Sequence, residues 1–290
     1  MAERFLIINA DDFGISESSN AAITELFEGE KITSAGILAP APFAGEAAAI
    51  SGRRNYSVGV HWTLTSEWAK WPWKPCGDAP TLLEDGFLTA DKNILKQAKS
   101  CDVTKELEAQ YLHLLDLGCR PDHADSHAGT LYGTNGRLFF LNAYALCRKY
   151  SLPFRFATED SFLTRQFGGN VSPVLKLASG AIGAIGKLRG VDLLGDFCSD
   201  PRPVERIGGL SDLKAWYETQ LATLQGQVCE VFMHPCLPDG ELLSRSPQWQ
   251  KRVWEYEYLK SGDLILAARE AGFRVVSWRE AFIYSGKTMR

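Results

Sequence analysis

Two adjacent carboxylates, Asp11 and Asp12, end a short apolar run near the start of the chain. The run, residues 5–10, predicts a strand that is buried on both faces, so the residues that follow it emerge at the rim of a core. Neighbouring negative charges repel each other and raise the pKa of one group, unless a cation or hydrogen-bond donors offset the repulsion. A metal ion that binds one carboxylate, while the other accepts a proton, would satisfy both groups.

Other residues of the same chemical kind lie at the ends of predicted strands. They are four of the five histidines and one more carboxylate: His61, His123, Asp125, His127 and His234. The carboxyl ends of parallel strands form one rim, and ligands bind there in α/β folds. We therefore expect these side chains to converge with Asp11 and Asp12.

One carboxylate with two imidazoles is a common set of metal ligands that leaves positions open for water and substrate. Asp12, His61 and His127 would form this set. The metal would lower the pKa of a bound water and polarise a carbonyl, while Asp11 accepts a proton and His234 donates one to the leaving group. The sequence thus predicts one divalent ion. Magnesium or zinc is expected, and manganese and cobalt also suit these ligands.

Each of these residues also has a purely structural interpretation. Asp11 and Asp12 could cap the next helix, because aspartate is favoured at the N-cap and in the first turn. A single histidine such as His61 is often a core residue with a satisfied hydrogen bond, and His234 before a proline could belong to a turn. The combination is more specific than any one residue, and it favours a site.

The elements that must position these residues alternate along the chain. Predicted strands span residues 5–10, 33–38, 57–60, 123–125, 154–156, 193–197, 230–233 and 273–277, and predicted helices span residues 18–28, 45–51, 104–117, 138–150, 211–224 and 263–271. This alternation predicts a parallel sheet, and seven or eight such units predict a TIM-barrel-like (β/α) barrel formed by one domain, residues 1–290. Two long excursions, residues 62–99 and 160–190, are expected to hold lids or extra elements.

Composition excludes several classes of partner. The 290 residues carry a formal net charge of -4 without a basic cluster, which argues against nucleic acid. The seven cysteines include no Cys-x-x-Cys pair, as expected of reduced thiols in the cytoplasm. The first apolar run is too short for a signal peptide, and charges interrupt the apolar segment 174–191, so we expect a cytoplasmic protein without a membrane partner. That segment would pack on the barrel or on a second subunit of a homodimer.

Four sequence motifs occur in a recognisable order and spacing: Asn9-Ala-Asp-Asp-Phe-Gly14, Gly59-Val-His-Trp-Thr-Leu-Thr65, Arg120-Pro-Asp-His-Ala-Asp-Ser-His127 and Met233-His-Pro235. Together they resemble the YdjC family, the chitooligosaccharide deacetylase group that is also called ChbG/HpnK deacetylases. The resemblance extends over nearly the whole chain. It implies a distorted barrel of parallel strands, a divalent metal bound by one aspartate and two histidines, and hydrolysis of N-acetyl groups on sugars.

By position, the resemblance assigns the same roles as the residue chemistry. Asp12, His61 and His127 match the metal ligands, Asp11 matches the base, and His234 matches the acid. One position departs from the family pattern, which usually continues Asp-Ser-His with a second histidine two residues later. Here that position is Gly129. The missing histidine is not an implied ligand, so we expect metal binding to persist and substrate contacts to differ.

Four further residues could support the metal or contact an N-acetylated sugar. Alternation places His123 and Asp125 on one face of their strand, where Asp125 would fix the tautomer of a ligand imidazole or cap the strand end. Arg155 would orient substrate or pair with a carboxylate. Trp62 begins a tryptophan-rich stretch, whose rings would stack on a sugar or form local core or an oligomer contact.

Two rival functions remain open from the sequence. Paired aspartates after a first strand also serve phosphoester hydrolases, although the chain lacks a P-loop and any obvious Lys/Arg cradle beside the acids. A noncatalytic sugar-binding protein is the other alternative, and the altered Gly129 position motivates it. Metal-dependent deacetylation of an amino sugar remains the leading hypothesis.

Overall fold

The computed structural model describes residues 3–133, 136–169, 171–239 and 244–284. In these ranges nine strands form one sheet in which every pairing is parallel. The strands are β1 (Arg4–Phe13), β2 (Ser34–Ile37), β3 (Val58–Trp62), β6 (Ala124–Ser126), β7 (Phe154–Ala157), β8 (Leu193–Leu194), β9 (Asp196–Cys198), β10 (Val228–Met233) and β11 (Phe273–Val275). The predicted parallel sheet is therefore confirmed.

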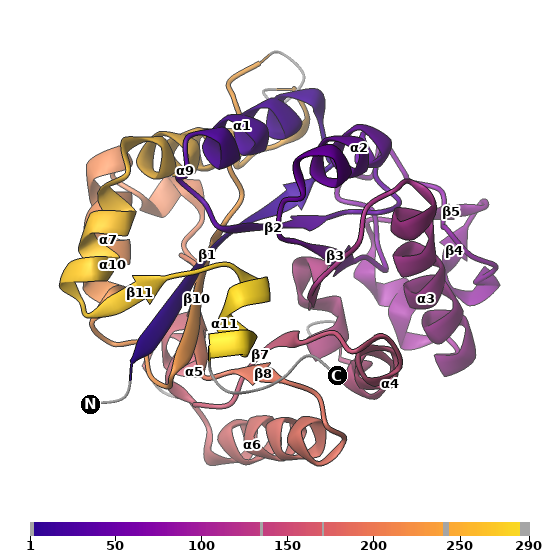
Figure 1. The fold of residues 1–290 in the computed structure, drawn as a ribbon. Coiled ribbons are helices and arrows are strands. Elements are labelled where there is room, and N and C mark those ends of the chain that lie inside the picture. Colours follow the sequence, from indigo (N-terminus) through magenta and orange to yellow (C-terminus); the bar gives the residue numbers. More distant parts are fainter. Residues whose placement is uncertain (1–2, 134–135, 170, 240–243, 285–290) are drawn as a thin grey trace.

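The sheet is nearly closed into a barrel. Its order is β8-β7-β6-β3-β2-β1-β10-β9, and β8 and β9 are two halves of one segment interrupted at Gly195. The two ends of the sheet are thus adjacent along the chain. The short strand β11 pairs with Arg4–Leu6 of β1, before β2 begins its own pairing with β1 at Asn9. Because β11 pairs with the amino-terminal part of β1, β2 pairs only with its later residues, and the barrel is irregular there. The ring of strands is visible in Figure 1.

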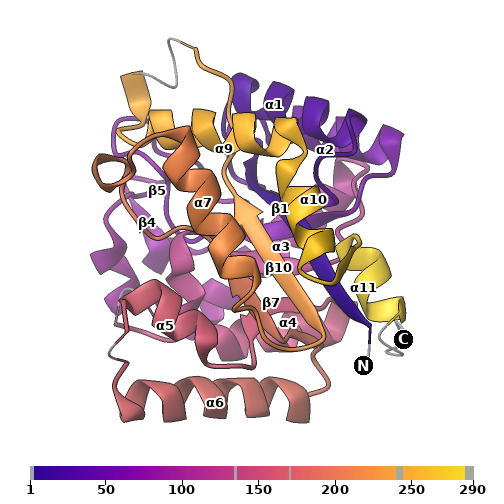
Figure 2. The same ribbon diagram turned by 90° about the vertical axis from the view of Figure 1, so that its left-hand side faces the viewer.

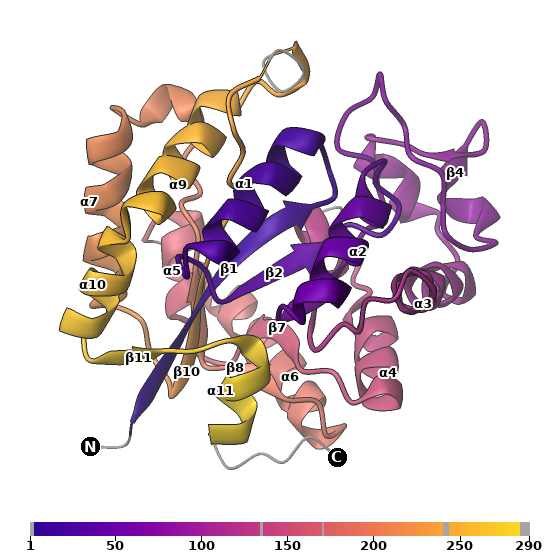
Figure 3. The same ribbon diagram turned by 45° about the horizontal axis from the view of Figure 1, so that its top comes forward.

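Helices cover the outside of the ring, as the alternating pattern predicts, and the last helix lies across its amino-terminal end (Figures 1 and 3). They are α1 (Glu17–Glu28), α2 (Ala44–Arg54), α3 (Ser100–Asp116), α4 (Phe140–Tyr150), α5 (Ser161–Phe167), α6 (Pro173–Leu188), α7 (Leu210–Leu221), α9 (Trp249–Ser261), α10 (Asp263–Glu270) and α11 (Trp278–Tyr284). Helix α1 begins where the sequence indicates, because Ser16 Oγ accepts a hydrogen bond from the Ser19 backbone N–H at 3.1 Å. No helix among the described residues has both the length and the apolar character needed to cross a membrane.

The two faces of β1 bury different sets of side chains. Leu6, Ile8 and Ala10 belong to the main core between strands and helices, whereas Phe5 and Ile7 belong to a second cluster that contains Trp278. Helix α11 therefore fills the amino-terminal end of the barrel, and it lies over the middle of the ring in Figure 1. The next residues on the inner face of β1 lead to the carboxyl-terminal end, where the polar side chains are.

The two excursions contain elements of their own. Residues 62–99 hold the hairpin β4 (Leu83–Glu84) and β5 (Phe87–Leu88) with the 3-10 helices η1 (Pro80–Leu82) and η2 (Lys92–Lys96). Trp68 and Trp73 pack there with Ile15 and Leu38 in a small separate core. Residues 160–190 hold α5 and α6, except that residue 170 lies outside the described residues.

Candidate active site

Asp11 and Asp12 both face the site because β1 is irregular at its end. In a regular strand, neighbouring side chains point to opposite faces. The pairing of β1 with β2 shifts register between Ala10 and Phe13, and Asp12 takes a left-handed backbone with φ 65°. Aspartate tolerates this conformation better than most residues, and backbone strain of this kind clusters at functional sites. The irregularity brings two adjacent carboxylates to one place.

Asp12, His61 and His127 form a compact cluster of potential metal ligands. His61 lies on the inner face of β3, and His127 begins the 3-10 helix η3 (His127–Tyr132) directly after β6. Asp12 Oδ1 lies 3.6 Å from His61 Nε2 and 3.3 Å from His127 Nδ1. One donor atom from each residue lies within 4.8 Å of the other two, and all three residues are buried. The structure thus brings together the three residues predicted as ligands.

The donor atoms of this cluster fit a divalent cation. Asp12 Oδ1 is buried and has no hydrogen-bond partner among the described residues, while Asp12 Oδ2 accepts a bond from Arg252 at 2.7 Å. His61 Nδ1 lies 2.6 Å from Asp125 Oδ1, which leaves Nε2 toward Asp12. A carboxylate behind an imidazole is the usual arrangement that orients a metal-binding histidine. Imidazole and carboxylate together suit zinc and related ions.

A second group, Asp11, His61 and Asp125, also has donor atoms close enough for a cation. It shares His61 with the first group. Both of its carboxylates lie beside the Arg155 guanidinium, which is 2.7 Å from Asp11 Oδ2 and 2.8 Å from Asp125 Oδ2, so a cation between them would meet a positive charge. The group that contains Asp12 and His127 is therefore the better candidate.

The electrostatics of the cluster favour positive charge. Burial alone would raise the pKa of Asp12, but Arg252 and His127 lower it well below its usual value. Burial alone would lower the pKa of His127, but the Asp12 and Glu67 carboxylates, 3.3 and 3.1 Å from its ring nitrogens, raise it to about 10. The carboxylates around His127 therefore favour a positive charge at this place, which a bound cation would also supply.

Arg155 lies at the site and pairs with three carboxyl groups. It donates to both oxygens of Asp11 at 2.7 and 2.8 Å and to Glu230 at 2.7 and 3.0 Å, and it contacts Asp125 at 2.8 Å. Its guanidinium also lies 4.3 Å from the ring centre of Phe232. The prediction that Arg155 pairs with a carboxylate is confirmed, and its guanidinium contacts both oxygens of Asp11.

Replacing Arg155 with glutamine is expected to destabilise the fold by about 3–5 kcal/mol, because it leaves buried carboxylates without their counter-charge. The measurement is the free energy of unfolding in denaturant. Arg54→Gln is the control, since its ion pair with Glu28 is exposed and worth about 0–1 kcal/mol. Equal, small losses for the two variants would show that Arg155 does not hold the site together.

His234 lies near the same Asp11 oxygen as the His61 ring. Its Nε2 is 3.9 Å from Asp11 Oδ2, and its backbone N–H donates to Glu255 at 2.7 Å. The side chain is half-buried and lines the cavity described below. Burial would lower the pKa of His234, but the Glu255 carboxylate, 3.8 Å from His234 Nδ1, and the nearby aspartates raise it. A histidine that keeps its proton is suited to donate it.

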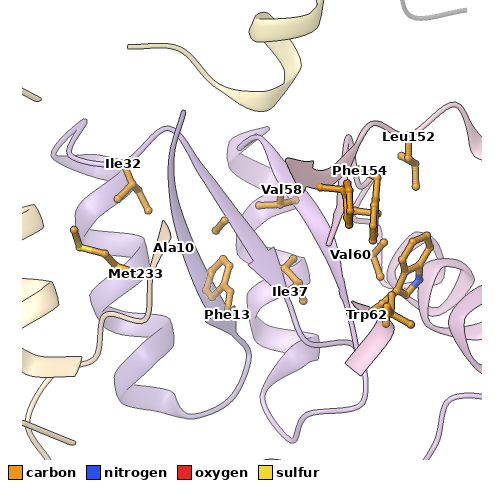
Figure 4. Packing of buried hydrophobic residues seen from close by; sticks show 14 of the residues in the cluster. Ala10, Phe13, Ile32, Ile37, Val58, Val60, Trp62, Leu152, Phe154 and Met233 are labelled. Carbon is orange, nitrogen blue, oxygen red and sulfur yellow. The ribbon is translucent and has the colours of Figure 1, made fainter. Parts of the chain in front are cut away.

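Two residues predicted as site residues, Trp62 and His123, do not line the cavity beside Asp11 and His234. Trp62 is fully buried in the main core, where it packs on Phe154 and donates its indole N–H to the backbone of Leu107 (Figure 4). The expected sugar contact of Trp62 is wrong, because β3 alternates and Trp62 points away from the His61 side.

His123 lies deeper in the barrel than the metal cluster. It stacks on Trp278 with ring centres 4.7 Å apart, and its Nδ1 lies 2.7 Å from Asp122. Gly59 makes room for it, since a Cβ there would come within 2.4 Å of the His123 ring. His123 therefore packs between the barrel strands and α11 and does not line the cavity.

Four charged residues of the site were not predicted from the sequence: Glu67, Glu230, Arg252 and Glu255. Glu230 could have been found, because it is a carboxylate in the middle of an apolar strand. It lies two residues before Phe232 and four before His234, and alternation places all three on one face. Glu67 comes from the long excursion and contacts His127 Nε2 at 3.1 Å. Arg252 and Glu255 come from α9, which the sequence analysis did not predict.

A nearly closed parallel barrel with an Asp-His-His cluster at the carboxyl ends of its strands defines a (β/α) barrel protein with a candidate metal centre. The chain belongs to the YdjC-like protein family, whose model matches residues 5–269. The resemblance read from the four motifs is thereby confirmed.

Individual relatives cover almost the whole chain. A carbohydrate deacetylase of Enterococcus faecalis is 31% identical over 96% of this chain and 98% of its own, and one of Geobacillus stearothermophilus is 28% identical with the same coverage. Among solved structures, an Enterococcus faecalis protein whose name proposes cellobiose-phosphate cleavage superposes with a TM-score of 0.75. It is 25% identical, and the match covers 96% of this chain and 99% of that one.

Proposed function

We propose that this protein is a divalent-metal-dependent deacetylase that hydrolyses the N-acetyl group of an amino sugar and releases acetate. The observation that carries the proposal is the buried Asp12-His61-His127 cluster, with an unpartnered carboxylate oxygen, beside a second carboxylate and a histidine with a raised pKa. The relatives named carbohydrate deacetylase support the reaction class.

Each side chain has a separate task in this reaction. A cation held by Asp12, His61 and His127 would supply Lewis acidity to the acetyl carbonyl and lower the pKa of the attacking water. Asp11, fixed by Arg155 and by the Asn9 amide at 2.7 Å, accepts the proton that the water loses as its oxygen bonds to the acetyl carbon.

The leaving nitrogen needs a proton before the C–N bond breaks. His234 is placed to donate it, since its Nε2 lies 3.9 Å from the Asp11 carboxylate and both residues line one cavity. The products are acetate and the free amine of the sugar. Arg155 keeps the Asp11 oxygens oriented throughout the reaction, because its contacts to Asp125 and Glu230 hold it in place.

The two rival functions fit the geometry less well. The two arginines beside the acids, Arg155 and Arg252, are both paired with buried carboxylates, so neither is available to bind a transferring phosphoryl group. A noncatalytic binding protein would not need a base and an acid next to each other in one cavity. Gly129 lines this cavity as well, in a left-handed turn with φ 67°.

The direct test is a substrate panel with two readouts. Purified protein with measured metal content is assayed for acetate release from N-acetylated mono- and oligosaccharides and for phosphate release from sugar phosphates. We expect acetate from at least one acetylated sugar and no phosphate. Phosphate release without acetate would support the phosphoester alternative, and binding without turnover over the whole panel would support the noncatalytic one.

Asp125→Asn is expected to weaken metal binding about 10- to 100-fold, because it weakens the hydrogen bond that orients His61. Metal affinity is measured by competition with a chelator of known affinity. Asp122→Asn makes the same chemical change at an aspartate–histidine pair outside the metal cluster, 2.7 Å from His123. An equal loss of affinity in both variants would mean that Asp125 has no specific role at the metal.

A further inference from the structure

The most exposed apolar side chains of the described residues lie on one segment, residues 161–191. Phe167 is 63% exposed, Val174 76%, Leu177 77% and Leu188 89%, and every other large apolar residue that the structure describes is less exposed than these four. Single exposed apolar residues are ordinary on a protein surface. A group of them in one place marks a contact with another molecule or with a membrane.

Helix α6 presents most of this group as a strip along its outer side. The strip consists of Val174, Leu177, Ala181, Ala184 and Leu188, which follow one another at intervals of three and four residues and so share one face of the helix. All five are exposed. The strip is about 21 Å long, given the helical rise per residue. In Figures 1 and 2 α6 forms the lower edge of the molecule, with the barrel on one side of it.

The opposite side of α6 is occupied by the protein itself. Ala178, Ser179 and Ile182 line a cavity of about 640 Å³ that is also lined by residues of the candidate active site. Gly186 lies against the barrel, since a Cβ there would come within 2.9 Å of the Tyr144 ring. The outer strip contributes no residue to this cavity. Its apolar side chains therefore have a function, if any, outside the active site.

The charge of the same segment differs from that of the whole chain. Residues 161–191 contain four basic residues and no acidic one, in a chain whose formal net charge is -4. Arg165 is used inside the protein, where it pairs with a buried aspartate. The other three, Lys176, Lys187 and Arg189, are exposed. The apolar strip is thus accompanied by positive charge.

The two lysines flank the strip. Lys176 and Lys187 are eleven residues apart, about three helical turns, and so project from the same flank of α6. Lys176 also reaches Asp160 at 2.8 Å, but the two side chains are 44% and 52% exposed, and an ion pair so exposed is weak. A lysine at the edge of an apolar face lays its methylenes along that face and places its charge at the level of lipid headgroups.

A second copy of the chain fits this face less well than an anionic surface does. Two α6 helices that pack on their strips in an antiparallel arrangement bring the same flank of each helix together. Lys176 of one copy would then lie opposite Lys187 of the other, and like charges in contact repel. A bilayer that contains anionic lipids attracts each of these charges instead.

We propose that the outer face of α6 docks the protein on a bilayer surface that contains anionic lipids. The helix lies in the plane of the interface, with the large apolar side chains of the strip among the headgroups and upper acyl chains and with the lysines at the phosphates. The charges within residues 174–191, from which the sequence predicted no membrane partner, argue against a spanning helix but suit a helix that lies flat. Docking of this kind does not depend on the reaction proposed above.

The test is flotation of the full-length protein with vesicles of two compositions, phosphatidylcholine alone and phosphatidylcholine with about one-quarter phosphatidylglycerol. We expect binding to the anionic vesicles to be at least about tenfold stronger than binding to the neutral ones, because exposed basic residues lie beside the strip. Added salt should weaken the binding to anionic vesicles, since it screens these charges.

Two double variants separate the apolar from the electrostatic contribution. Leu177→Gln with Leu188→Gln should lower binding to anionic vesicles at least about tenfold, because both side chains leave water when the helix docks. Lys176→Gln with Lys187→Gln should lower it about tenfold and leave binding to neutral vesicles unchanged. Leu266→Gln, at a 58% exposed leucine of α10, is the control that should bind as the wild type does.

Three results would overturn the proposal. The first is a wild-type protein that does not float with the anionic vesicles, and the second is equal binding by the wild type and the double leucine variant. The third is a dimer in sedimentation velocity that the double leucine variant dissociates, which would assign the strip to a second copy of the chain.

Discussion

Replacing Asp11 with asparagine is expected to lower kcat for acetate release at least about a hundredfold while the bound metal stays in place. The variant keeps the size of the side chain but removes the proton acceptor that Arg155 orients at 2.7 and 2.8 Å. Asp12, His61 and His127 are unchanged, so the metal ligands persist. The measurement pairs kcat with metal content on the same sample.

Asp160→Asn is the control for this experiment, since Asp160 is an exposed aspartate that pairs with Lys176 outside the site. It should retain both turnover and metal. Full activity of Asp11→Asn would exclude Asp11 as the base. Loss of metal together with activity would instead assign Asp11 to the metal, as in the second group of donors with His61 and Asp125.

His127→Ala is expected to have the largest effect on metal binding, with a loss of affinity of at least about a hundredfold and no measurable turnover. The residue contributes a donor atom 3.3 Å from the unpartnered oxygen of Asp12. Its removal also leaves Arg252 as the remaining neighbour that lowers the pKa of both Asp12 and Glu67. The measurement is metal content after dialysis against a weak chelator.

His113→Ala is the matched control, because His113 is an exposed histidine on α3 outside the site. It should bind metal as the wild type does. Full metal occupancy in the His127→Ala protein would show that the ligand assignment is wrong, provided that its circular dichroism shows a folded protein.

The strands of the sheet could be predicted from the pattern of apolar residues along the chain. Strands buried on both faces appear as short apolar runs, so the eight predicted runs all correspond to strands of the sheet. The run 193–197 is two strands, β8 and β9, because the chain bends at Gly195 where the barrel closes. Helix α9 was missed, since its buried residues include Arg252 and Glu255 and so give little apolar periodicity.

The site could be predicted where residue type and strand position act together. Asp11, Asp12, His61, His127 and His234 all follow or end predicted strands, and the structure places them around one cluster and one cavity.

Residues from long loops and helices were less accessible to prediction. No local pattern connects Glu67 in the excursion to His127, or Arg252 on α9 to Asp12, since these contacts depend on the tertiary fold. Trp62, in contrast, was predicted as a possible site residue but lies in the core. Its neighbour His61 faces inward, so strict alternation along β3 already directs Trp62 to the outer core.

Asp12, His61 and His127 are proposed to hold one divalent ion that hydrolysis requires. The most direct test is a titration of metal-free protein with zinc or magnesium, followed by acetate release from an N-acetylated amino sugar. We predict that activity is absent without metal, rises with added ion and reaches its plateau at about one equivalent per chain. Acetate release that is unaffected by complete removal of the metal would contradict the account.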